Sequence, residues 1–243
     1  MAGAKKSALK YQRVLLKLSG EAFAGEERFG INHKSLAWIA DQVAEAVKSG
    51  AELALVVGGG NFFRGGREGW GIKDRVSVDY LGMLATVMNA VALQESLIQQ
   101  GVESRVLSAI EVPQICEPYI RPRALNHLKK GRVVILSAGT GNPFFTTDTA
   151  AALRALELEC QALFKATRVK GVYDSDPEKN PNAKFFPKLD YTEALKRNLK
   201  IMDATALSLC RDHNLPILVF NLFEKGNLKK ALLGKKVGTL VSS

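Results

Sequence analysis

The chain has 243 residues, of which 47% are hydrophobic and 24% charged, and its formal net charge is +10. These values are ordinary for a globular protein large enough to bury a full core, and they exclude a disordered or disulfide-stapled chain. A basic balance favours anionic partners, but no RNA-binding or helix-turn-helix signature accompanies it, so nucleic acid is not favoured over small anions.

Short apolar runs bounded by Gly, Asn or Pro predict strands along the chain. The expected strands are Arg13–Leu18, Leu53–Val57, Glu103–Leu107, Val133–Ser137, Ala162–Ala166 and Ile217–Phe220. Helical patterns lie between most of them, at His33–Ser49, Val78–Gln100, Thr147–Glu159, Tyr191–Asn198 and Asp203–His213. Alternating strands and helices predict an α/β fold, with an open, mostly parallel central sheet and helices on both faces.

We expect a single domain over residues 1–243, with residues 1–10 as a flexible start. The polar, proline-containing stretch 168–190 is predicted to be a long ordered loop on the ligand face. The helix at Val78–Gln100 is apolar nearly all round, which indicates either a subunit interface or a central helix of one subunit.

Cysteines and histidines do not form a recognisable metal or disulfide pattern. The three cysteines lie far apart, at Cys116, Cys160 and Cys210, and the histidines are His33, His127 and His213. The first ten residues lack the apolar stretch of a signal peptide, and no apolar run is expected to approach membrane-spanning length. We therefore expect a cytoplasmic protein without a membrane partner or a protein metal site.

Residues 134–150, VILSAGTGNPFFTTDTA, carry the most specific chemistry. An apolar strand runs into a glycine-containing turn, two phenylalanines, two threonines and Asp148, and then into a helix. Helix N-termini attract anions, and Phe144 and Phe145 offer flat faces for a base. The alternative is a strand-to-helix turn whose two phenylalanines belong to the core.

Two further strand ends carry phosphate-binding chemistry. Lys17-Leu18-Ser19-Gly20 closes the first strand, where the ammonium group can face a phosphate, although a solvated lysine is the alternative. Gly58-Gly59-Gly60 closes the second strand and Arg64 follows it; glycine amides can form an anion nest, although a flexible loop is the alternative. Neither a P-loop nor a dinucleotide fingerprint is present.

A third polar segment follows the fifth expected strand. It runs from Lys165 through Thr167 and Tyr173 to Asp176, and it offers a ring face and hydrogen bonds to a base or ribose, with a plain acidic turn as the alternative. Asp79, near the start of the long helix, either accepts hydrogen bonds from a ribose or caps that helix.

The chain resembles the bacterial UMP kinases (uridylate kinases), a family within the amino acid kinase superfamily. The resemblance extends over essentially the whole chain. It rests on KLSGE at 17–21, GGGNFFRG at 58–65, GMLATVMNA at 82–90, VVILSAGTGNPFFTTD at 133–148, KATRVKGVYDSDP at 165–177 and RDHNLPILVFN at 211–221. It implies the amino acid kinase fold and transfer of phosphate from ATP to UMP, giving UDP.

The resemblance also implies roles for individual residues. ATP would be bound by Lys17, Leu18, Ser19, Gly20, Gly60, Arg64, Thr167, Tyr173 and Asp176. UMP would be bound by Gly59, Asp79, Thr140, Gly141, Asn142, Pro143, Phe144, Phe145, Thr146 and Thr147. The implied catalytic residues are Lys17, Arg64, Asp148 and Lys165, while Asp203 matches an acidic position of unassigned role.

The family further implies Mg²⁺ as the ATP complex, a homo-oligomer that is usually a hexamer, activation by GTP and inhibition by UTP. The allosteric segment would be Gly25, Glu26, Glu27, Arg28, Phe29 and Gly30. Two alternatives stay open. One is a superfamily kinase acting on a carboxylate or carbamate, and the other is a non-catalytic nucleotide sensor or nucleic-acid-binding regulator.

Overall fold

The computed structural model describes residues 9–27, 29–63 and 71–243. Three earlier expectations fall outside this range: the flexible start up to residue 8, and the roles of Arg28 and Arg64.

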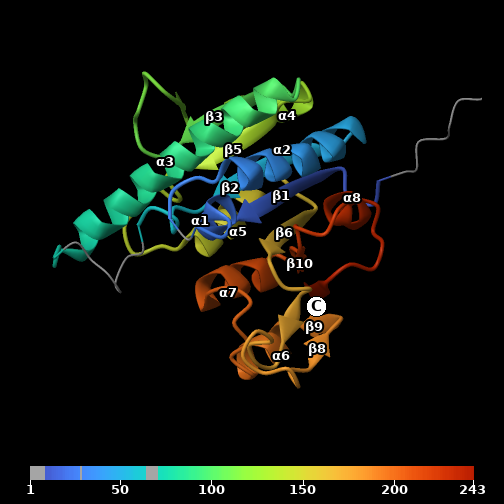
Figure 1. Ribbon diagram of the computed structural model, residues 1–243. Coiled ribbons are helices and arrows are strands. Elements are labelled where there is room, and N and C mark those ends of the chain that lie inside the picture. Colours follow the sequence, from blue (N-terminus) through green and yellow to red (C-terminus); the bar gives the residue numbers. More distant parts are fainter. Residues whose placement is uncertain (1–8, 28, 64–70) are drawn as a thin grey trace, which may run out of the picture.

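Within the described residues, a nine-stranded sheet forms the centre of the fold, in the order β4-β3-β5-β2-β1-β6-β10-β11-β9 (Figure 1). All neighbouring pairs are parallel except β10 and β11. The strands are β1 (Arg13–Leu18), β2 (Glu52–Val57), β3 (Ser104–Ser108), β4 (Glu117–Pro118), β5 (Val133–Ser137), β6 (Ala162–Thr167), β9 (Lys188–Asp190), β10 (Ile217–Asn221) and β11 (Thr239–Ser242). The six predicted strands are all present, and the mostly parallel sheet is confirmed.

Helices cover both faces of the sheet because side chains alternate between the faces along each strand. Leu16 of β1 joins one apolar core and its neighbour Leu15 joins the other. The first core includes residues of α1 (Gly20–Ala24), α2 (His33–Lys48), α3 (Arg75–Gln99) and α8 (Asn227–Leu232). The second includes residues of α4 (Arg121–Lys129), α5 (Thr147–Glu157), α6 (Tyr191–Lys196) and α7 (Ala204–Asp212).

The long helix α3 begins three residues earlier than predicted because Asp74 caps it, accepting a hydrogen bond from Ser77 N at 2.9 Å. By length and composition alone α3 is long and apolar enough to cross a membrane, with a mean hydropathy of 1.5 over an 18-residue window, so the expectation that no apolar run approaches this length is wrong. Its buried residues, such as Leu93 and Leu97, pack into the first core. Helices of folded cores pass the same test for this reason.

The stretch 168–190 is more regular than the predicted loop. It contains the antiparallel pair β7 (Val172–Tyr173) and β8 (Phe185–Phe186), followed by β9. The rings of Tyr173 and Phe185 lie 5.4 Å apart and hold this short hairpin together. Strands of two or three residues are too short to show a periodic pattern in the sequence.

Candidate active site

Polar segments that are far apart in sequence meet at one edge of the sheet. Strands β1, β2, β5 and β6 are parallel neighbours, so their carboxyl ends lie together, and ligands of such sheets bind beyond these ends. The segments that follow them are the lysine turn after β1, the glycine triplet after β2, the turn after β5 and the segment after β6. The sheet therefore brings together the four segments that the sequence singled out.

At the centre of this edge, Asp148 lies between two lysines. Its carboxylate is 2.9 Å from Lys17 Nζ and 2.9 Å from Lys165 Nζ. Lys17 and Lys165 are direct cross-strand neighbours in β1 and β6, and Asp148 comes from the first turn of α5. Two ammonium groups on adjacent strands repel each other, and a carboxylate between them offsets that repulsion.

Burial and the close opposite charges shift the pKa values of the side chains in this cluster. Burial raises the pKa of Asp148, but the adjacent Lys17 and Lys165 ammonium groups outweigh it and hold the pKa below its ordinary value. Burial lowers the pKa of Lys165, and Asp148 offsets this only in part. Lys17 Nζ forms an ion pair with Asp148 Oδ1, whereas Lys165 Nζ donates a hydrogen bond to Asp148 Oδ2.

The glycine turns after β1 and β2 are packed directly against each other. A Cβ on Gly20 would lie 2.3 Å from Gly60 N, and a Cβ on Gly58 would lie 2.9 Å from Gly20 N. A side chain at either position would push the two turns apart. The glycines are therefore required by close backbone approach, which argues against a merely flexible loop.

A buried asparagine pair, not singled out from the sequence, holds the glycine triplet in place. Asn61 Nδ2 donates to Asn89 Oδ1 at 2.9 Å, and Asn89 Nδ2 donates to Asn61 Oδ1 at 2.7 Å. Asn89 Nδ2 also donates to Gly58 O at 2.8 Å. Buried amides are costly unless hydrogen-bonded, and a polar residue on the core side of an apolar helix is the signal that identifies Asn89.

One pocket of about 260 Å³ opens between the glycine triplet, α3 and the turn after β5. Its lining includes the predicted residues Gly59, Gly60, Asp79, Thr140, Asn142, Phe145, Thr146 and Thr147. It also includes residues that sequence analysis missed, namely Phe63, Arg75, Val78, Gly82, Met83, Thr86 and Gly139. Gly141, Pro143 and Phe144 are not among its lining residues. We call this the triplet-side pocket.

Asp79 joins α3 to the turn after β5 instead of capping the helix. Its carboxylate accepts a hydrogen bond from Phe144 N at 2.7 Å and pairs with Arg75 Nε at 2.8 Å. The cap of α3 is Asp74, so the capping alternative for Asp79 is wrong. One carboxylate oxygen thus positions the turn that borders the triplet-side pocket.

The two phenylalanines of this turn are exposed. Phe144 is 68% exposed and Phe145 is 53% exposed, so the alternative that both belong to the core is wrong. Phe144 adopts a left-handed backbone with φ of 72°, and its ring lies 5.9 Å from the Arg75 guanidinium. Large apolar rings that face solvent beside a polar pocket are available to a ligand.

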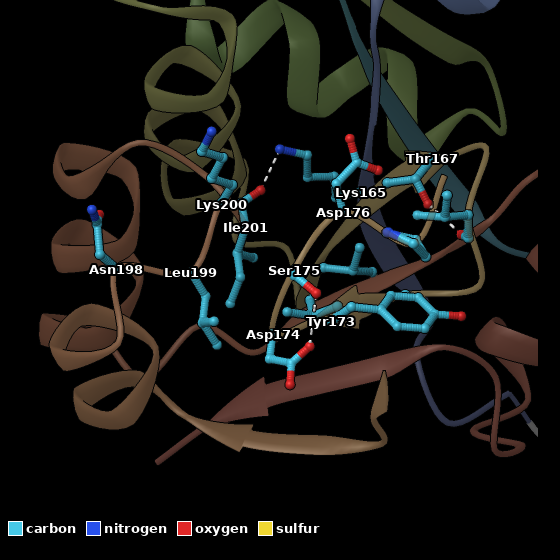
Figure 2. A pocket seen from close by; sticks show the side chains of 15 residues that line it. Lys165, Thr167, Tyr173, Asp174, Ser175, Asp176, Asn198, Leu199, Lys200 and Ile201 are labelled. Atoms are coloured by element: carbon cyan, nitrogen blue, oxygen red, sulfur yellow. Dashed lines mark hydrogen bonds between the residues drawn. The ribbon is translucent and has the colours of Figure 1, made fainter. Parts of the chain in front are cut away.

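A second pocket, of about 410 Å³, lies beside Lys165 on the β6 side of the cluster (Figure 2). Its lining includes the predicted residues Lys165, Thr167, Tyr173 and Asp176. Sequence analysis missed its other wall, which is formed by Asn198, Leu199, Lys200 and Ile201. Lys165 Nζ donates to Ile201 O, so the same side chain connects this wall to Asp148. We call this the β6-side pocket.

The side chains of the β6-side pocket differ in how firmly they are held. Thr167 Oγ1 lies 2.7 Å from Val169 O and 3.1 Å from Phe220 O, as a donor within the fold. Asp176 Oδ1 accepts from Glu178 N at 3.0 Å, and its other oxygen is 3.9 Å from exposed Lys179. Thr167 supports the strand end, while Asp176 remains accessible at the rim.

Asp203 ties α7 to the start of α5. It caps α7 by accepting from Ala206 N at 2.8 Å, and it accepts from Thr149 Oγ1 at 2.9 Å and from Thr146 Oγ1. Thr146 in turn caps α5 by accepting from Asp148 N at 3.1 Å. These contacts set the position of the helix turn that carries Asp148.

The segment 25–30 borders a different pocket. This pocket, of about 910 Å³, is lined by Gly25, Glu26 and Glu27 but not by Phe29 or Gly30, and Arg168 forms part of its wall. Arg168 follows Thr167 of the β6-side pocket and donates to Glu21 O at 3.0 Å. Arg28, like Arg64, lies outside the described residues.

Among residues 9–27, 29–63 and 71–243, no group of three or more His, Cys, Asp or Glu side chains is arranged to hold a metal ion. Asp148 is the carboxylate of the central cluster, and both of its oxygens face ammonium groups. Mg²⁺ binds readily through one or two carboxylates together with substrate phosphates. The donor set fits a metal that arrives with a nucleotide.

Comparison with known proteins agrees with this geometry. The sequence model described as the amino acid kinase family matches residues 12–221. The fold is similar to the UMP kinase from Bacillus anthracis, with 43% identity, 96% of each chain covered and a TM-score of 0.91. It is also similar to the UMP kinase from Ureaplasma parvum, with 38% identity, 97% of this chain and 100% of that chain covered and a TM-score of 0.88.

A more distant similarity links the chain to the uridylate kinase from Archaeoglobus fulgidus. Here the identity is 25%, the TM-score is 0.70, and the alignment covers 94% of this chain and 99% of that chain. The family match spans most of the sequence, and the two bacterial kinases align over nearly their whole length. The chain belongs to the amino acid kinase family.

Proposed function

We propose that the protein transfers the γ-phosphoryl group of ATP to the phosphate of UMP, giving ADP and UDP. The observation that carries the proposal is the buried Lys17–Asp148–Lys165 cluster, which borders the β6-side pocket through Lys165 and the triplet-side pocket through the start of α5. The two bacterial proteins compared above are UMP kinases, which supports UMP as the acceptor.

In this proposal the two pockets take the two nucleotides. The β6-side pocket holds the adenosine of ATP against Tyr173, with Asp176 at the rim, and Lys17 to Gly20 and Gly60 contact its phosphates. The triplet-side pocket holds UMP, with Asp79 at its ribose and the turn 140–147 around its base and phosphate. Phe144 and Phe145 are exposed, so their rings are accessible to a ligand in this pocket.

Phosphoryl transfer needs in-line positioning and fixed positive charge more than covalent chemistry. The acceptor oxygen of UMP is already ionised near neutral pH, so no general base is required. Lys17 and Lys165 supply positive charge at the transferred group, and Asp148 keeps both ammonium groups oriented before substrate enters. Arg64 is proposed to add a third cation. Asp148 is the carboxylate that would face Mg²⁺ brought in with ATP, and the ion would supply further positive charge beside the nucleotide phosphates.

The direct test is ADP formation from Mg·ATP with UMP or with CMP. Rapid turnover with UMP and little with CMP is expected. Turnover with a carboxylate or carbamate acceptor, and not with UMP, would support another small-molecule kinase. Nucleotide binding without any turnover, with GTP also present, would support a sensor.

We also propose that the protein is a homo-oligomer, specifically a hexamer, and that it acts in the cytoplasm. Tyr80, Leu84 and Met88 form an exposed apolar stripe at helical spacing on α3, which suits contact with a second copy. Met88→Glu should lower the mass measured by light scattering, while Gln99→Glu on the same helix should not. A monomeric unaltered protein would refute the proposal.

Activation by GTP and inhibition by UTP are proposed to act through the pocket at residues 25–27. Arg168 connects its wall to the strand end that carries Thr167, which gives a physical path to the β6-side pocket. An Arg168→Ala variant that retains basal turnover but no longer responds to GTP is expected. An unchanged GTP response would place the effector elsewhere.

A further inference from the structure

A separate pocket of about 410 Å³ lies behind the β6-side pocket, on the opposite face of β10. Leu218 lines this pocket, whereas the next residue, Val219, lines the β6-side pocket. Successive strand residues point to opposite faces, so the sheet separates the two spaces. We call it the lysine-rimmed pocket, and a ligand there does not overlap a nucleotide in the β6-side pocket.

The floor of the lysine-rimmed pocket is apolar. Tyr11, Leu218 and Ala231 are buried side chains, and Leu240 is partly buried beside them. A cavity of this size with aliphatic and aromatic walls has the dimensions of a small-molecule site. Its walls favour the apolar body of a ligand over a polar base.

Among the described residues, the rim carries four ammonium groups and no carboxylate. Lys10, Lys188, Lys235 and Lys236 line the opening, and no Asp or Glu lines it with them. None of these four lysines forms an ion pair within the described residues. The lysines that do pair with carboxylates there are Lys17, Lys165, Lys179 and Lys229. Lys10 Nζ lies 5.1 Å from the centre of the Tyr11 ring, directly above the apolar floor.

Backbone contacts hold the walls of the lysine-rimmed pocket in place. Lys10 N donates to Leu232 O at 2.9 Å, which joins the start of the chain to the end of α8 (Figure 1). Leu240 N donates to Pro187 O at 3.1 Å, which closes the opposite side. Gly238 has φ of 60°, and a Cβ there would lie 1.9 Å from Val219 O, so this corner requires glycine.

We propose that the lysine-rimmed pocket binds a small amphipathic anion, which has an apolar chain or ring and one phosphate, carboxylate or sulfonate group. The apolar body would lie on the floor, and the anion would meet the lysines at the rim. Charge complementarity carries this assignment, because like charges that have no counter-ion among the described residues favour an anionic partner. Residues 1–8 contain two lysines and no carboxylate, so their charge does not complement the rim.

The test is calorimetric titration of the full-length protein with monomeric octyl phosphate. Octyl phosphate should bind, whereas octanol and inorganic phosphate should bind far more weakly, since each lacks half of the recognised chemistry. Saturating Mg·ATP or UMP should not displace it. Binding needs no turnover, so a protein inactive toward UMP would leave this result interpretable.

A charge-matched pair of variants locates the site. Lys235→Glu with Lys236→Glu should weaken octyl phosphate binding about tenfold. Each substitution replaces an attraction between an ammonium group and the ligand phosphate, comparable to a surface ion pair, by a repulsion. Lys129→Glu with Lys130→Glu, an exposed lysine pair at the end of α4, changes net charge equally and should leave binding within about twofold. Circular dichroism confirms that both variants fold.

Four outcomes would overturn the proposal. They are no binding by the unaltered protein, equal loss in both double variants, displacement by ATP or UMP, and binding only to phosphatidylglycerol vesicles. The last would indicate a membrane surface as the source of the anion instead of a free ligand.

Discussion

Lysines occur in two opposite settings in this molecule. Lys17 and Lys165 are largely buried side by side and share Asp148 at 2.9 Å each, whereas Lys235 and Lys236 are exposed at the rim of the lysine-rimmed pocket and make no ion pair within the described residues. Burying a charge costs free energy unless a partner compensates it, while an exposed ammonium group stays hydrated. The first pair is a fixed, desolvated source of positive charge, and the second attracts anions without fixed geometry.

The largest expected difference between the two settings is in turnover. Lys17→Ala should lower kcat with Mg·ATP and UMP about 100- to 1,000-fold, because it removes a preorganised charge at the transferred phosphate. Steady-state kinetics measures this, with circular dichroism to confirm the fold. Near-full turnover in Lys17→Ala would refute the role assigned to the buried lysine.

The second largest difference between the buried and the exposed setting is expected in the free energy of unfolding. Asp148→Asn keeps the shape of the side chain but removes the charge between two buried ammonium groups, and it should lower the free energy of unfolding by about 3 kcal/mol. Urea titration at neutral pH measures the change. The control is Asp176→Asn, whose exposed carboxylate is 3.9 Å from Lys179 and should matter by less than about 1 kcal/mol. An equal loss of stability in Asp148→Asn and Asp176→Asn would contradict the distinction between buried and exposed charge pairs.

Acid should remove the stabilising effect of Asp148. Its pKa is lowered in the folded protein, so its contribution to stability is complete above the pKa of the unfolded chain and is lost as pH falls through the folded-state pKa. The stability difference between the unaltered protein and Asp148→Asn should therefore shrink progressively in acid. A difference that stays constant down to the acid unfolding limit would show that Asp148 does not act through its charge.

The smallest effect is expected at the rim. Lys235→Ala with Lys236→Ala should change the free energy of unfolding by less than about 0.5 kcal/mol and leave kcat unchanged, because neither ammonium group is buried or forms an ion pair with another described residue. The same urea and kinetic measurements apply. A large loss of stability would show that these lysines belong to the structural framework.

Much of the site was predictable because it follows strand ends. Lys17, Gly60 and Lys165 stand at or just after predicted strands, and parallel neighbours bring such positions to one edge. The second wall of the β6-side pocket was not predictable in this way. Asn198 to Ile201 follow a short helix, and only the packing of α6 and α7 against the sheet brings them opposite Tyr173.

Local chemistry was also ambiguous where one residue type serves two purposes. Asp79 stands near a helix start, where carboxylates commonly cap; its contact with Phe144 N spans 65 residues of sequence and depends on the tertiary fold. The pairing of Asn61 with Asn89 across 28 residues is another such long-range contact.

The α/β class, the six main strands and the polar segments at their ends follow from the sequence alone, since apolar periodicity and glycine placement are local properties. The sequence alone does not show which charged side chains form ion pairs with each other. Lys17, Asp148 and Lys165 meet because β1 pairs with β6 and Thr146 and Asp203 position the first turn of α5. Burial and ion pairing depend on these long-range contacts. They are the reason that two lysines are buried and paired while other lysines, with the same side chain, are exposed.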